Sequence, residues 1–317
     1  MGSKIKLILG TMNFGPQVND EDSLKMVNQF IASGNNELDA AFVYNNGDTE
    51  KILGSILSNL TINDISIATK IHPRISGKLD ADAVNFQFSE SLKRMGLEKV
   101  DILYFHFPDA NTSVEDALKA VNSLYENGKI KEFGLSNFPA WMVVDIWHIC
   151  KTNGWLCPSV YQGRYNALSR NVEPELMPAL RQLNIRFYAY NPLAGGMLTG
   201  KHMNFEEQPQ QGRFARLQSY RKRYWKKSYF DAVNIVSSIC KEYSIAPVEA
   251  AYRWLANYSL LDCDRNDGII VGASSLIQLE QNMKALHKGE LPQQIVDSLD
   301  AAWSEAKCES PKYFEFF

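Results

Sequence analysis

The sequence lacks a cysteine framework. Its 317 residues include only five cysteines, an odd and scattered set without a C-x-x-C pair. This pattern argues against both a disulfide scaffold and a zinc site, because each needs paired or closely spaced thiols. We therefore expect reduced thiols and no metal. The five are Cys150, Cys157, Cys240, Cys263 and Cys308.

A long apolar run and an excess of charge are also missing. The apolar run between Met1 and Gly10 is too short for a signal peptide, and no later stretch approaches the length of a membrane span. The 33 Lys and Arg residues nearly balance the 36 Asp and Glu residues, which leaves a net charge of -3. We expect a cytoplasmic protein with no nucleic-acid partner and no membrane partner.

A third absence concerns dinucleotide binding. No G-x-G-x-x-G motif follows any of the strands that the sequence predicts. That motif forms the phosphate-binding turn of the Rossmann fold, so a nicotinamide cofactor would need another mode of binding here.

The composition that is present is that of an ordinary globular protein. Hydrophobic residues make up 45% and charged residues 22%, with a mean hydropathy of -0.26. Short apolar or β-branched runs recur along the chain, each followed by a helical pattern, which indicates βα units around a parallel sheet. The eight predicted strands are Lys6–Leu9, Glu37–Asp39, Ile65–Lys70, Asp101–His106, Ile130–Leu135, Val160–Gln162, Arg186–Tyr190 and Ile269–Val271.

Eight βα units without a linker favour a single closed (β/α)8 TIM barrel domain over residues 1–317. A doubly wound open sheet is the structural alternative. The longest gap between strands, Pro192–Tyr229, predicts a long loop after the seventh strand, on the catalytic face of a barrel. The pattern over Pro292–Lys307 predicts an extra C-terminal helix.

The clearest helical pattern covers Ser113–Asn127, where apolar residues recur at helical spacing. Ser113 and Asp116 resemble a capping box at its start, and Gly128 is expected to end it.

Ionisable side chains stand at the ends of three consecutive strands. Asp39 ends the second strand, Tyr44 follows in its loop, Lys70 ends the third and His106 the fourth. In a parallel barrel these ends meet at one rim. Each residue alone has an ordinary structural explanation, such as a helix cap or a core histidine, but together they predict a site.

Such a group suits proton transfer to a carbonyl oxygen. A tyrosine is a weak acid, with an unperturbed pKa of about 10, so a nearby cation is needed to favour its phenolate. We expect Lys70 to supply that charge and so to lower the pKa of Tyr44, with Asp39 holding the ammonium group. His106 would orient the carbonyl by a hydrogen bond.

At these residues the chain resembles the aldo-keto reductase superfamily along essentially its whole length. Within it, the sequence is most similar to the aflatoxin-aldehyde reductase branch, which includes succinic semialdehyde reductases. The superfamily motifs are Glu37-Leu-Asp-Ala-Ala-Phe-Val-Tyr44, Ala68-Thr-Lys70, Asp101-Ile-Leu-Tyr-Phe-His106, Gly134-Leu-Ser-Asn137 and Tyr161-Gln162. The branch motifs are Phe42-Val-Tyr-Asn-Asn-Gly47, His106-Phe-Pro-Asp109, Tyr190-Asn-Pro-Leu-Ala-Gly-Gly196 and Gly272-Ala-Ser-Ser-Leu-Ile-Gln-Leu-Glu-Gln-Asn282.

The resemblance implies an NADPH-dependent aldehyde reductase. Asp39, Tyr44, Lys70 and His106 match the catalytic residues, and Tyr44 matches the proton donor. Tyr190 matches an aromatic ring that stacks on the nicotinamide, although a core aromatic is the alternative. The residues that match contacts to the nicotinamide carboxamide are Ser136, Asn137 and Gln162.

The loop after the seventh strand matches the family's pyrophosphate contacts. The run from Gly195 to His202 satisfies G-x-x-x-x-G-K but has His202 where a P-loop needs Ser or Thr. An NTPase is therefore the third functional hypothesis, after the reductase and a cofactor-sensing subunit. A glycine-rich turn with a lysine can still bind a pyrophosphate through backbone N–H groups. The residues implied in this loop are Asn191, Leu193, Gly195 and Lys201.

Contacts to the adenosine end of the cofactor are implied for residues of the last βα unit and of the basic loop. Ser274 and Ser275 stand at a predicted helix start, a position that suits the 2′-phosphate of NADP, and Gln278 and Asn282 are expected to lie off the buried stripe. A capped surface helix is the alternative. Arg213 matches a contact to the cofactor phosphate.

The stretch from Gly212 to Lys227 is basic and aromatic, so binding of a nucleic acid is an alternative. A single short basic patch on a chain with a net negative charge makes that alternative less favourable. The family instead places this loop over the site, where Arg223 matches a residue that binds a substrate carboxylate beside Tyr44 and His106. Relatives that favour carboxylate-bearing aldehydes can have a basic residue at the C-terminus, whereas this chain has Phe316-Phe317. Arg164 is an additional cation, which either replaces that charge or pairs with a carboxylate.

The sequence therefore predicts reduction of small polar, carboxylate-bearing or dicarbonyl aldehydes by NADPH. The branch suggests a homodimer. The alternative is a cofactor-sensing regulatory subunit resembling the β subunits of potassium channels, which share the fold and the catalytic residues.

Overall fold

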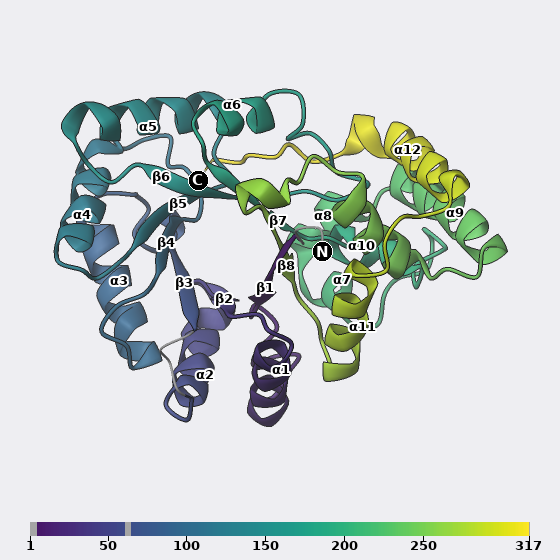
Figure 1. Ribbon diagram of the computed structural model, residues 1–317, viewed down its shortest axis with the longest axis horizontal. Helices are drawn as coiled ribbons and strands as arrows, with labels where there is room; N and C mark the ends of the chain where they lie inside the picture. Colours follow the sequence, from purple (N-terminus) through teal and green to yellow (C-terminus); the bar gives the residue numbers. More distant parts are fainter. Residues whose placement is uncertain (1–4, 61–64, 317) are drawn as a thin grey trace.

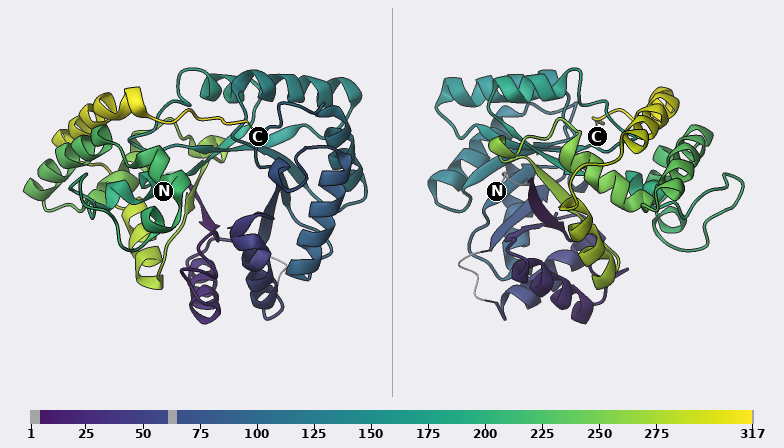
Figure 2. Two further views of the ribbon diagram at one scale, coloured as in Figure 1. Left: turned by 180° about the vertical axis from the view of Figure 1, so that it is seen from behind. Right: turned by 45° about the vertical axis from the view of Figure 1, so that its right-hand side comes forward.

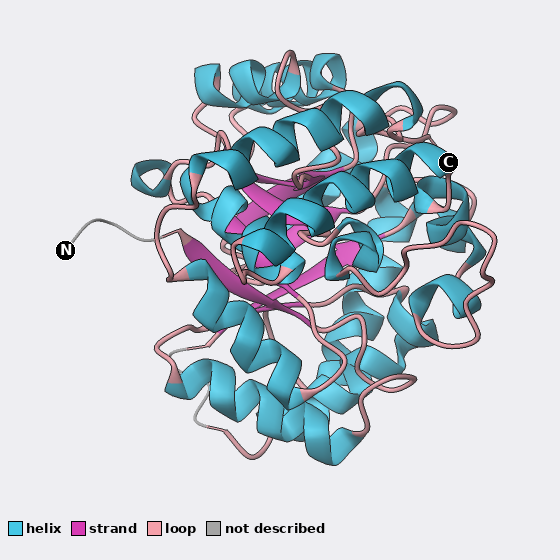
Figure 3. Cartoon of the chain, turned by 90° about the vertical axis from the view of Figure 1, so that its right-hand side faces the viewer, coloured by secondary structure: helices cyan, strands magenta, loops and turns pink. Residues whose placement is uncertain are grey.

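The computed structural model describes residues 5–60 and 65–316. Its parallel strands follow one another in chain order around a closed barrel, and the last strand pairs with the first. Figure 3 shows the strands at the centre with helices around them. The predicted (β/α)8 barrel is thus confirmed over an open sheet. The strands are β1 (Lys6–Gly10), β2 (Glu37–Asp39), β3 (Ser66–Ile71), β4 (Ile102–Phe105), β5 (Glu132–Ser136), β6 (Pro158–Arg164), β7 (Arg186–Tyr190) and β8 (Gly268–Val271).

Helices cover the outside of the barrel (Figure 1). The helices of the repeating units are α1 (Asp20–Ala32), α2 (Asp48–Leu57), α3 (Ala81–Met95), α4 (Glu115–Glu126), α5 (Ala140–Asn153), α6 (Leu176–Gln182), α10 (Pro247–Asn257) and α11 (Leu276–Leu286). None of the helices in 5–60 and 65–316 is long and apolar enough to cross a membrane.

The predicted insertion after β7 and the C-terminal helix are both present. The insertion contains the short helices η4 (Ala194–Thr199), α7 (Arg213–Arg216) and α8 (Gln218–Tyr224), and then α9 (Lys227–Glu242). The C-terminal helix α12 (Gln293–Ala306) packs along α9, as both views of Figure 2 show. Short 3-10 turns complete the chain: η1 (Tyr44–Gly47), η3 (Pro73–Ile75), η5 (Cys263–Arg265) and η6 (Lys307–Glu309).

Alternation along the strands decides which side chains enter the barrel. In β3, Ile67 and Ile71 pack outward against the helices, so Ala68 and Lys70 face inward. The interior also contains Tyr104 and Tyr188, which lie in a small cluster separate from the main core. The strand pattern thus places Lys70 inside the barrel, near its C-terminal end.

A glycine makes room for one of these rings. A Cβ at Gly134 would lie 2.4 Å from the Tyr104 ring. Tyr104 is fully buried, so the ring occupies the space that a side chain at Gly134 would need.

Two sequence predictions on element ends need correction. The helix predicted over Ser113–Asn127 begins at Glu115, and the Ser113 hydroxyl accepts a hydrogen bond from the Glu115 N–H at 3.4 Å, so no capping box with Asp116 forms. Strand β6 continues to Arg164, beyond the predicted end at Gln162, because apolar alternation stops at Gly163 although the backbone pairing with β7 does not. Gly128, with φ 65°, follows the end of α4 as predicted.

Candidate active site

The predicted site residues meet at the C-terminal ends of the strands. They surround a cavity of about 1140 Å³, a size that suits an extended ligand. Every residue predicted for the site lines this cavity except Lys70, which is buried and bonded to Asp39 in the cavity lining. Those lining it are Asp39, Tyr44, His106, Ser136, Asn137, Gln162, Tyr190, Asn191, Leu193, Gly195, Lys201, Arg213, Arg223, Ser274, Gln278 and Asn282.

Lys70 and Asp39 form a buried ion pair. The Lys70 Nζ lies 2.7 Å from each Asp39 carboxylate oxygen and 2.6 Å from the Ala40 carbonyl oxygen. The Gln162 amide donates a further hydrogen bond to Asp39, at 2.8 Å. These bonds satisfy both charges in a region that excludes water.

Tyr44 stands above this pair, in η1. The Lys70 Nζ lies 5.1 Å from the centre of the Tyr44 ring, and the His106 ring meets Tyr44 edge-on with centroids 5.8 Å apart. Asn45 follows with φ 49° and donates hydrogen bonds to the Met12 and Phe14 carbonyls, which ties the turn to the loop after β1. The short strand β2 and this turn together fix the position of the phenol.

The expected effect on the acidity of Tyr44 is not observed. Burial, with a smaller contribution from the Asp39 carboxylate, raises the pKa of Tyr44 well above its ordinary value of 10. The ammonium group of Lys70 has three N–H donors, and Asp39 and Ala40 supply three acceptors for them. Tyr44 is therefore held in its protonated form.

His106 is also held neutral. Burial and then the charge of Lys70 lower its pKa well below 6.5. A neutral imidazole donates one N–H, so His106 can offer a hydrogen bond to a carbonyl oxygen in the cavity. Its backbone carbonyl accepts a hydrogen bond from the Asn137 amide at 2.9 Å.

Three of the four residues predicted for the nicotinamide end are joined by hydrogen bonds. The Tyr190 hydroxyl donates to the Asn137 side-chain oxygen at 2.6 Å, and the Asn137 amide lies 3.0 Å from the Ser136 hydroxyl. Together with the bond from Gln162 to Asp39, these contacts orient the polar groups around Tyr44 and His106.

The glycine-rich loop after β7 does not have the shape of a P-loop. Residues 194–199 form the 3-10 turn η4, with Gly195 at φ 70° and Gly196 at φ 118°, instead of leading into an α-helix. A Cβ at Gly195 would lie 2.9 Å from the Tyr224 ring, so the chain needs glycine there for close packing as well. Lys201 is exposed at the end of this turn.

Three loops join above the cavity. The Arg213 guanidinium, from the insertion after β7, donates to the Asn13 side-chain oxygen at 3.2 Å. Asn13 follows β1 and donates to the Ala273 carbonyl after β8, at 2.8 Å. The Arg213 guanidinium thus lies at the cavity, where hydrogen bonds connect three loops that are far apart in the sequence.

Helix α11 begins beside the cavity. Ser275 caps it, and the Ser274 hydroxyl donates to the Gln278 side-chain oxygen at 2.8 Å. Asn282 lines the cavity, as predicted for this end of the site, but it is only 5% exposed, and its amide donates to the Gly272 carbonyl. It therefore does not lie on a solvent-exposed polar face of the helix.

Two arginines at the substrate end differ from expectation. Arg223 lines the cavity but forms an ion pair with Glu315, at 3.2 Å. Arg164 is buried and donates to the Lys312 carbonyl at 3.0 Å. Within the described part of the chain, Arg164 has neither a carboxylate partner nor a place in the cavity lining, so neither of its two predicted roles is observed. Phe317 lies outside the described residues.

Several charged residues in or near the cavity were not predicted from the sequence. His72 and Arg74 line the cavity beside His106, and His72 follows β3 by one residue. The strand-end rule that selected His106 applies to His72 as well. Glu50 and Arg94 pair behind Lys70, from two helices, and no sequence motif signals that contact.

The basic stretch over 212–227 turns three of its four aromatic residues inward. Phe214, Tyr220 and Tyr224 are all buried. Bases stack on exposed rings, so this arrangement does not favour the nucleic-acid alternative.

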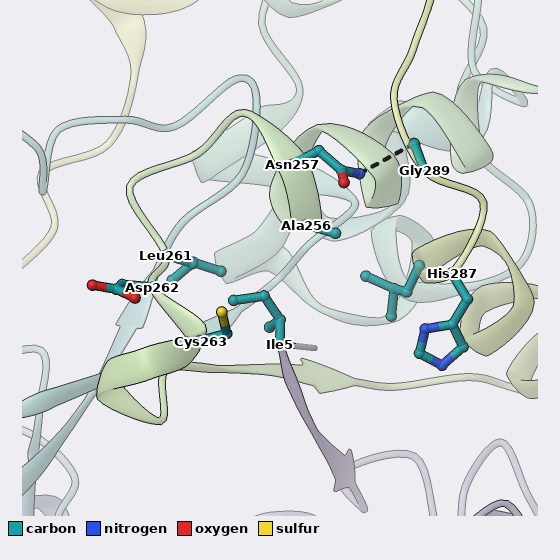
Figure 4. Close-up of a pocket in the computed structure, with 9 residues that line it drawn as sticks. Ile5, Ala256, Asn257, Leu261, Asp262, Cys263, His287 and Gly289 are labelled. Atoms are coloured by element: carbon teal, nitrogen blue, oxygen red, sulfur yellow. Dashed lines mark hydrogen bonds between the residues drawn. The ribbon is translucent and has the colours of Figure 1, made fainter. Parts of the chain in front are cut away.

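A second cavity, of about 320 Å³, lies near the N-terminal ends of β1 and β8. Asp262 and His287 lie on opposite sides of it (Figure 4). The Asp262 carboxylate accepts a hydrogen bond from the Asp264 N–H, and Asn257 donates to the Gly289 carbonyl. This cavity is remote from the residues of the active site.

Known proteins similar to this chain are reductases. A sequence model of the Aldo/keto reductase family matches residues 6–304. Aflatoxin B1 aldehyde reductase member 2 of Mus musculus is 42% identical, over 97% of this chain and 87% of the relative. The human Aldo-keto reductase family 7 member A3 is 41% identical, over 97% and 96%. Oxidoreductase sirO of Leptosphaeria maculans is 35% identical, over 97% and 96%.

Proposed function

Because the chain belongs to the aldo/keto reductase family, we propose that it is an NADPH-dependent aldehyde reductase with Tyr44 as its proton donor. The proposal rests on one arrangement above all: a protonated phenol and a neutral imidazole face one cavity, directly above a buried Lys70–Asp39 pair. Such groups are those that proton transfer to a carbonyl oxygen requires. We further propose one barrel domain over residues 1–317.

The cavity residues fit a nicotinamide dinucleotide phosphate. Enzymes of this family use nicotinamide cofactors, generally NADPH. Arg213 and Lys201 place cations at the rim, and the capped start of α11 offers N–H groups and the Ser274 hydroxyl, which suit phosphates. The side chains of Ser136, Asn137, Gln162 and Tyr190 would hold the nicotinamide. The bound cofactor would supply the hydride.

The protein's own residues would complete the reaction. His106 donates a hydrogen bond to the carbonyl oxygen and orients it. Tyr44 then transfers its proton to that oxygen as negative charge develops there. Asp39 keeps the Lys70 ammonium 5.1 Å from the ring centre, where its positive charge would favour the phenolate that remains, although burial outweighs that charge in the pKa of Tyr44.

The substrate class follows from the relatives and from Arg223. Relatives are named as aldehyde reductases, and an arginine in the cavity lining suits a carboxylate. We propose small polar aldehydes, including carboxylate-bearing and dicarbonyl ones. The homodimer and the cytoplasmic location stay predictions.

The test is the loss of NADPH absorbance with 4-nitrobenzaldehyde for the wild type and for Tyr44→Phe. We expect the variant to lose at least about a hundredfold in kcat, because it has no proton to transfer. NADPH affinity, measured by fluorescence quenching, should remain within about twofold, since the phenol ring stays. Tyr125→Phe, on the exposed face of α4, is the matched control and should retain full turnover.

Near wild-type turnover in Tyr44→Phe would contradict the proposed role of Tyr44. Tight NADPH binding by the wild type without turnover of any aldehyde would instead support the cofactor-sensing subunit.

A further inference from the structure

The C-terminal segment is fastened beside the C-terminal end of β6 and the start of α5. After η6 it runs from α12 toward β6, as the yellow trace of Figure 1 shows. Arg164, at the end of β6, donates to the Lys312 carbonyl at 3.0 Å. The Tyr313 hydroxyl donates to Glu175 at 2.8 Å and accepts from the Ala140 N–H at 3.1 Å. These bonds fix the segment two residues before Glu315.

Beyond these anchors, Glu315 pairs with Arg223, which lines the cavity. Its carboxylate lies 3.2 Å from the Arg223 guanidinium, and the two side chains are 57% and 22% exposed. Arg223 belongs to α8, so the ion pair joins the insertion after β7 to the C-terminal segment.

Arg223 lies in the same cavity as Tyr44 and His106. It lines the cavity, and its charge contributes to the lowered pKa of His106. The guanidinium also lies over the Tyr220 ring, 5.9 Å from its centre, which limits the directions in which it can present its N–H groups. A carboxylate bound to Arg223 would thus sit near the carbonyl that His106 orients.

We propose that Glu315 is a specificity residue, which acts through Arg223 as an internal competitor of substrate carboxylates. This inference rests on the proposed function, in which Arg223 binds the carboxylate of the aldehyde. An anionic aldehyde must displace Glu315 from Arg223 or share Arg223 with it, whereas an uncharged aldehyde needs neither. The pair therefore favours uncharged aldehydes over carboxylate-bearing ones.

The size of the effect follows from the exposure of the pair. Partly exposed ion pairs contribute about 0.2–1 kcal/mol, which corresponds to a factor of about 1.4 to 5. We expect Glu315→Gln to raise the ratio of kcat/KM for succinic semialdehyde to that for 4-nitrobenzaldehyde by about 1.4- to fivefold. The change should appear in KM for the semialdehyde and not in its kcat, because the chemical step is the same.

The matched control is Glu305→Gln, which removes the same charge from the exposed face of α12 and should leave the ratio unchanged. The decisive comparison is Glu315→Gln made in an Arg223→Ala background. There the ratio should not respond, because the residue through which Glu315 acts is gone.

An unchanged ratio in Glu315→Gln would overturn the inference, as would an equal shift in the Arg223→Ala background. Failure of the proposed function would look different, since the wild type would then turn over neither aldehyde.

Discussion

Arg94 holds the buried carboxylate of Glu50, whose charge acts on Lys70. The Arg94 Nη1 lies 3.1 Å from the Glu50 Oε2, and the Glu50 side chain is fully buried. The Thr69 hydroxyl donates to the other oxygen of Glu50 at 2.7 Å. Burial lowers the pKa of Lys70, and the charge of Asp39 and then that of Glu50 oppose this shift. The buried Lys70–Asp39 pair is therefore supported by a second pair.

Removal of Arg94 should destabilise the fold strongly. Arg94→Met leaves Glu50 buried without its cation, and loss of one partner of a buried pair costs about 3–5 kcal/mol. Chemical denaturation with urea measures the change in the free energy of unfolding.

The double variant Arg94→Met/Glu50→Gln tests the cause. It should recover part of the loss, because no unpaired charge then remains. Equal losses in the single and double variants would show that Arg94 acts through its packing on the Phe42 ring, 4.1 Å away, and not through its charge.

Lys70→Met should reduce activity more than cofactor binding. The variant removes the cation beside the phenol, and we expect kcat to fall by about 10²- to 10⁴-fold, the range of general acid catalysis. NADPH affinity should change by less than about tenfold, because Lys70 does not line the cavity.

The control for Lys70→Met is Lys51→Met, which breaks an exposed Lys–Asp pair of similar length, 3.0 Å. It should leave kcat unchanged. A Lys70→Met enzyme with more than about a tenth of wild-type kcat would contradict the role assigned to the ammonium group.

The sequence predicted the barrel and most of the cavity for a physical reason. Parallel strands bring their C-terminal ends to one rim, so polar residues at strand ends such as Asp39 and His106 can be grouped without a structure. The apolar alternation that defines the strands also stops there, which is why the strand-end residues stand out.

Contacts between side chains from different elements were beyond the sequence. The pairing of Arg223 with Glu315, 92 residues away, depends on the path of the C-terminal segment. The acidity of Tyr44 was predicted with the wrong sign, because the sequence shows that Lys70 is near but not that Asp39 and Ala40 take up its N–H groups. Burial then decides the pKa.

The pH dependence of the reaction should differ between its two directions. Reduction needs protonated Tyr44, and a pKa raised above 10 keeps that form throughout the neutral range. His106 stays neutral there because its pKa lies well below 6.5. We expect kcat for 4-nitrobenzaldehyde to be flat between about pH 6 and 8, and alcohol oxidation, which needs the phenolate, to rise with pH.

Initial rates in both directions across this range measure the effect. A loss of reduction on acidification with a midpoint near 6.5 would show that His106 titrates in the working enzyme and would contradict its assignment as a neutral donor.

Gly134→Ala should destabilise the barrel although it adds a single methyl group. The new Cβ would lie 2.4 Å from the Tyr104 ring, which is itself fully buried and has no room to move. Overpacking of this kind costs about 1–3 kcal/mol. Gly272→Ala is the matched control, because its Cβ would meet only the Gly10 carbonyl oxygen, at 4.0 Å. Equal midpoints for the two variants in urea would show that the ring adjusts at no cost.

His72 should make the fold sensitive to mild acid. Burial, and then the charge of Arg74, lower its pKa from 6.5 to about 3. Above pH 6.5 both folded and unfolded chains carry neutral His72, so its stabilising contribution is complete. Below that pH only the unfolded chain takes up the proton, and stability falls until the pH approaches 3. At pH 5 the loss from this residue is about 2 kcal/mol.

The test variant is His72→Asn, which keeps a side-chain acceptor for the Arg74 N–H. Between about pH 7 and 5 its free energy of unfolding, measured with urea, should fall by about 2 kcal/mol less than that of the wild type. His148→Asn, on the exposed side of α5, should follow the wild-type curve, and a His72→Asn curve parallel to it would contradict the assignment.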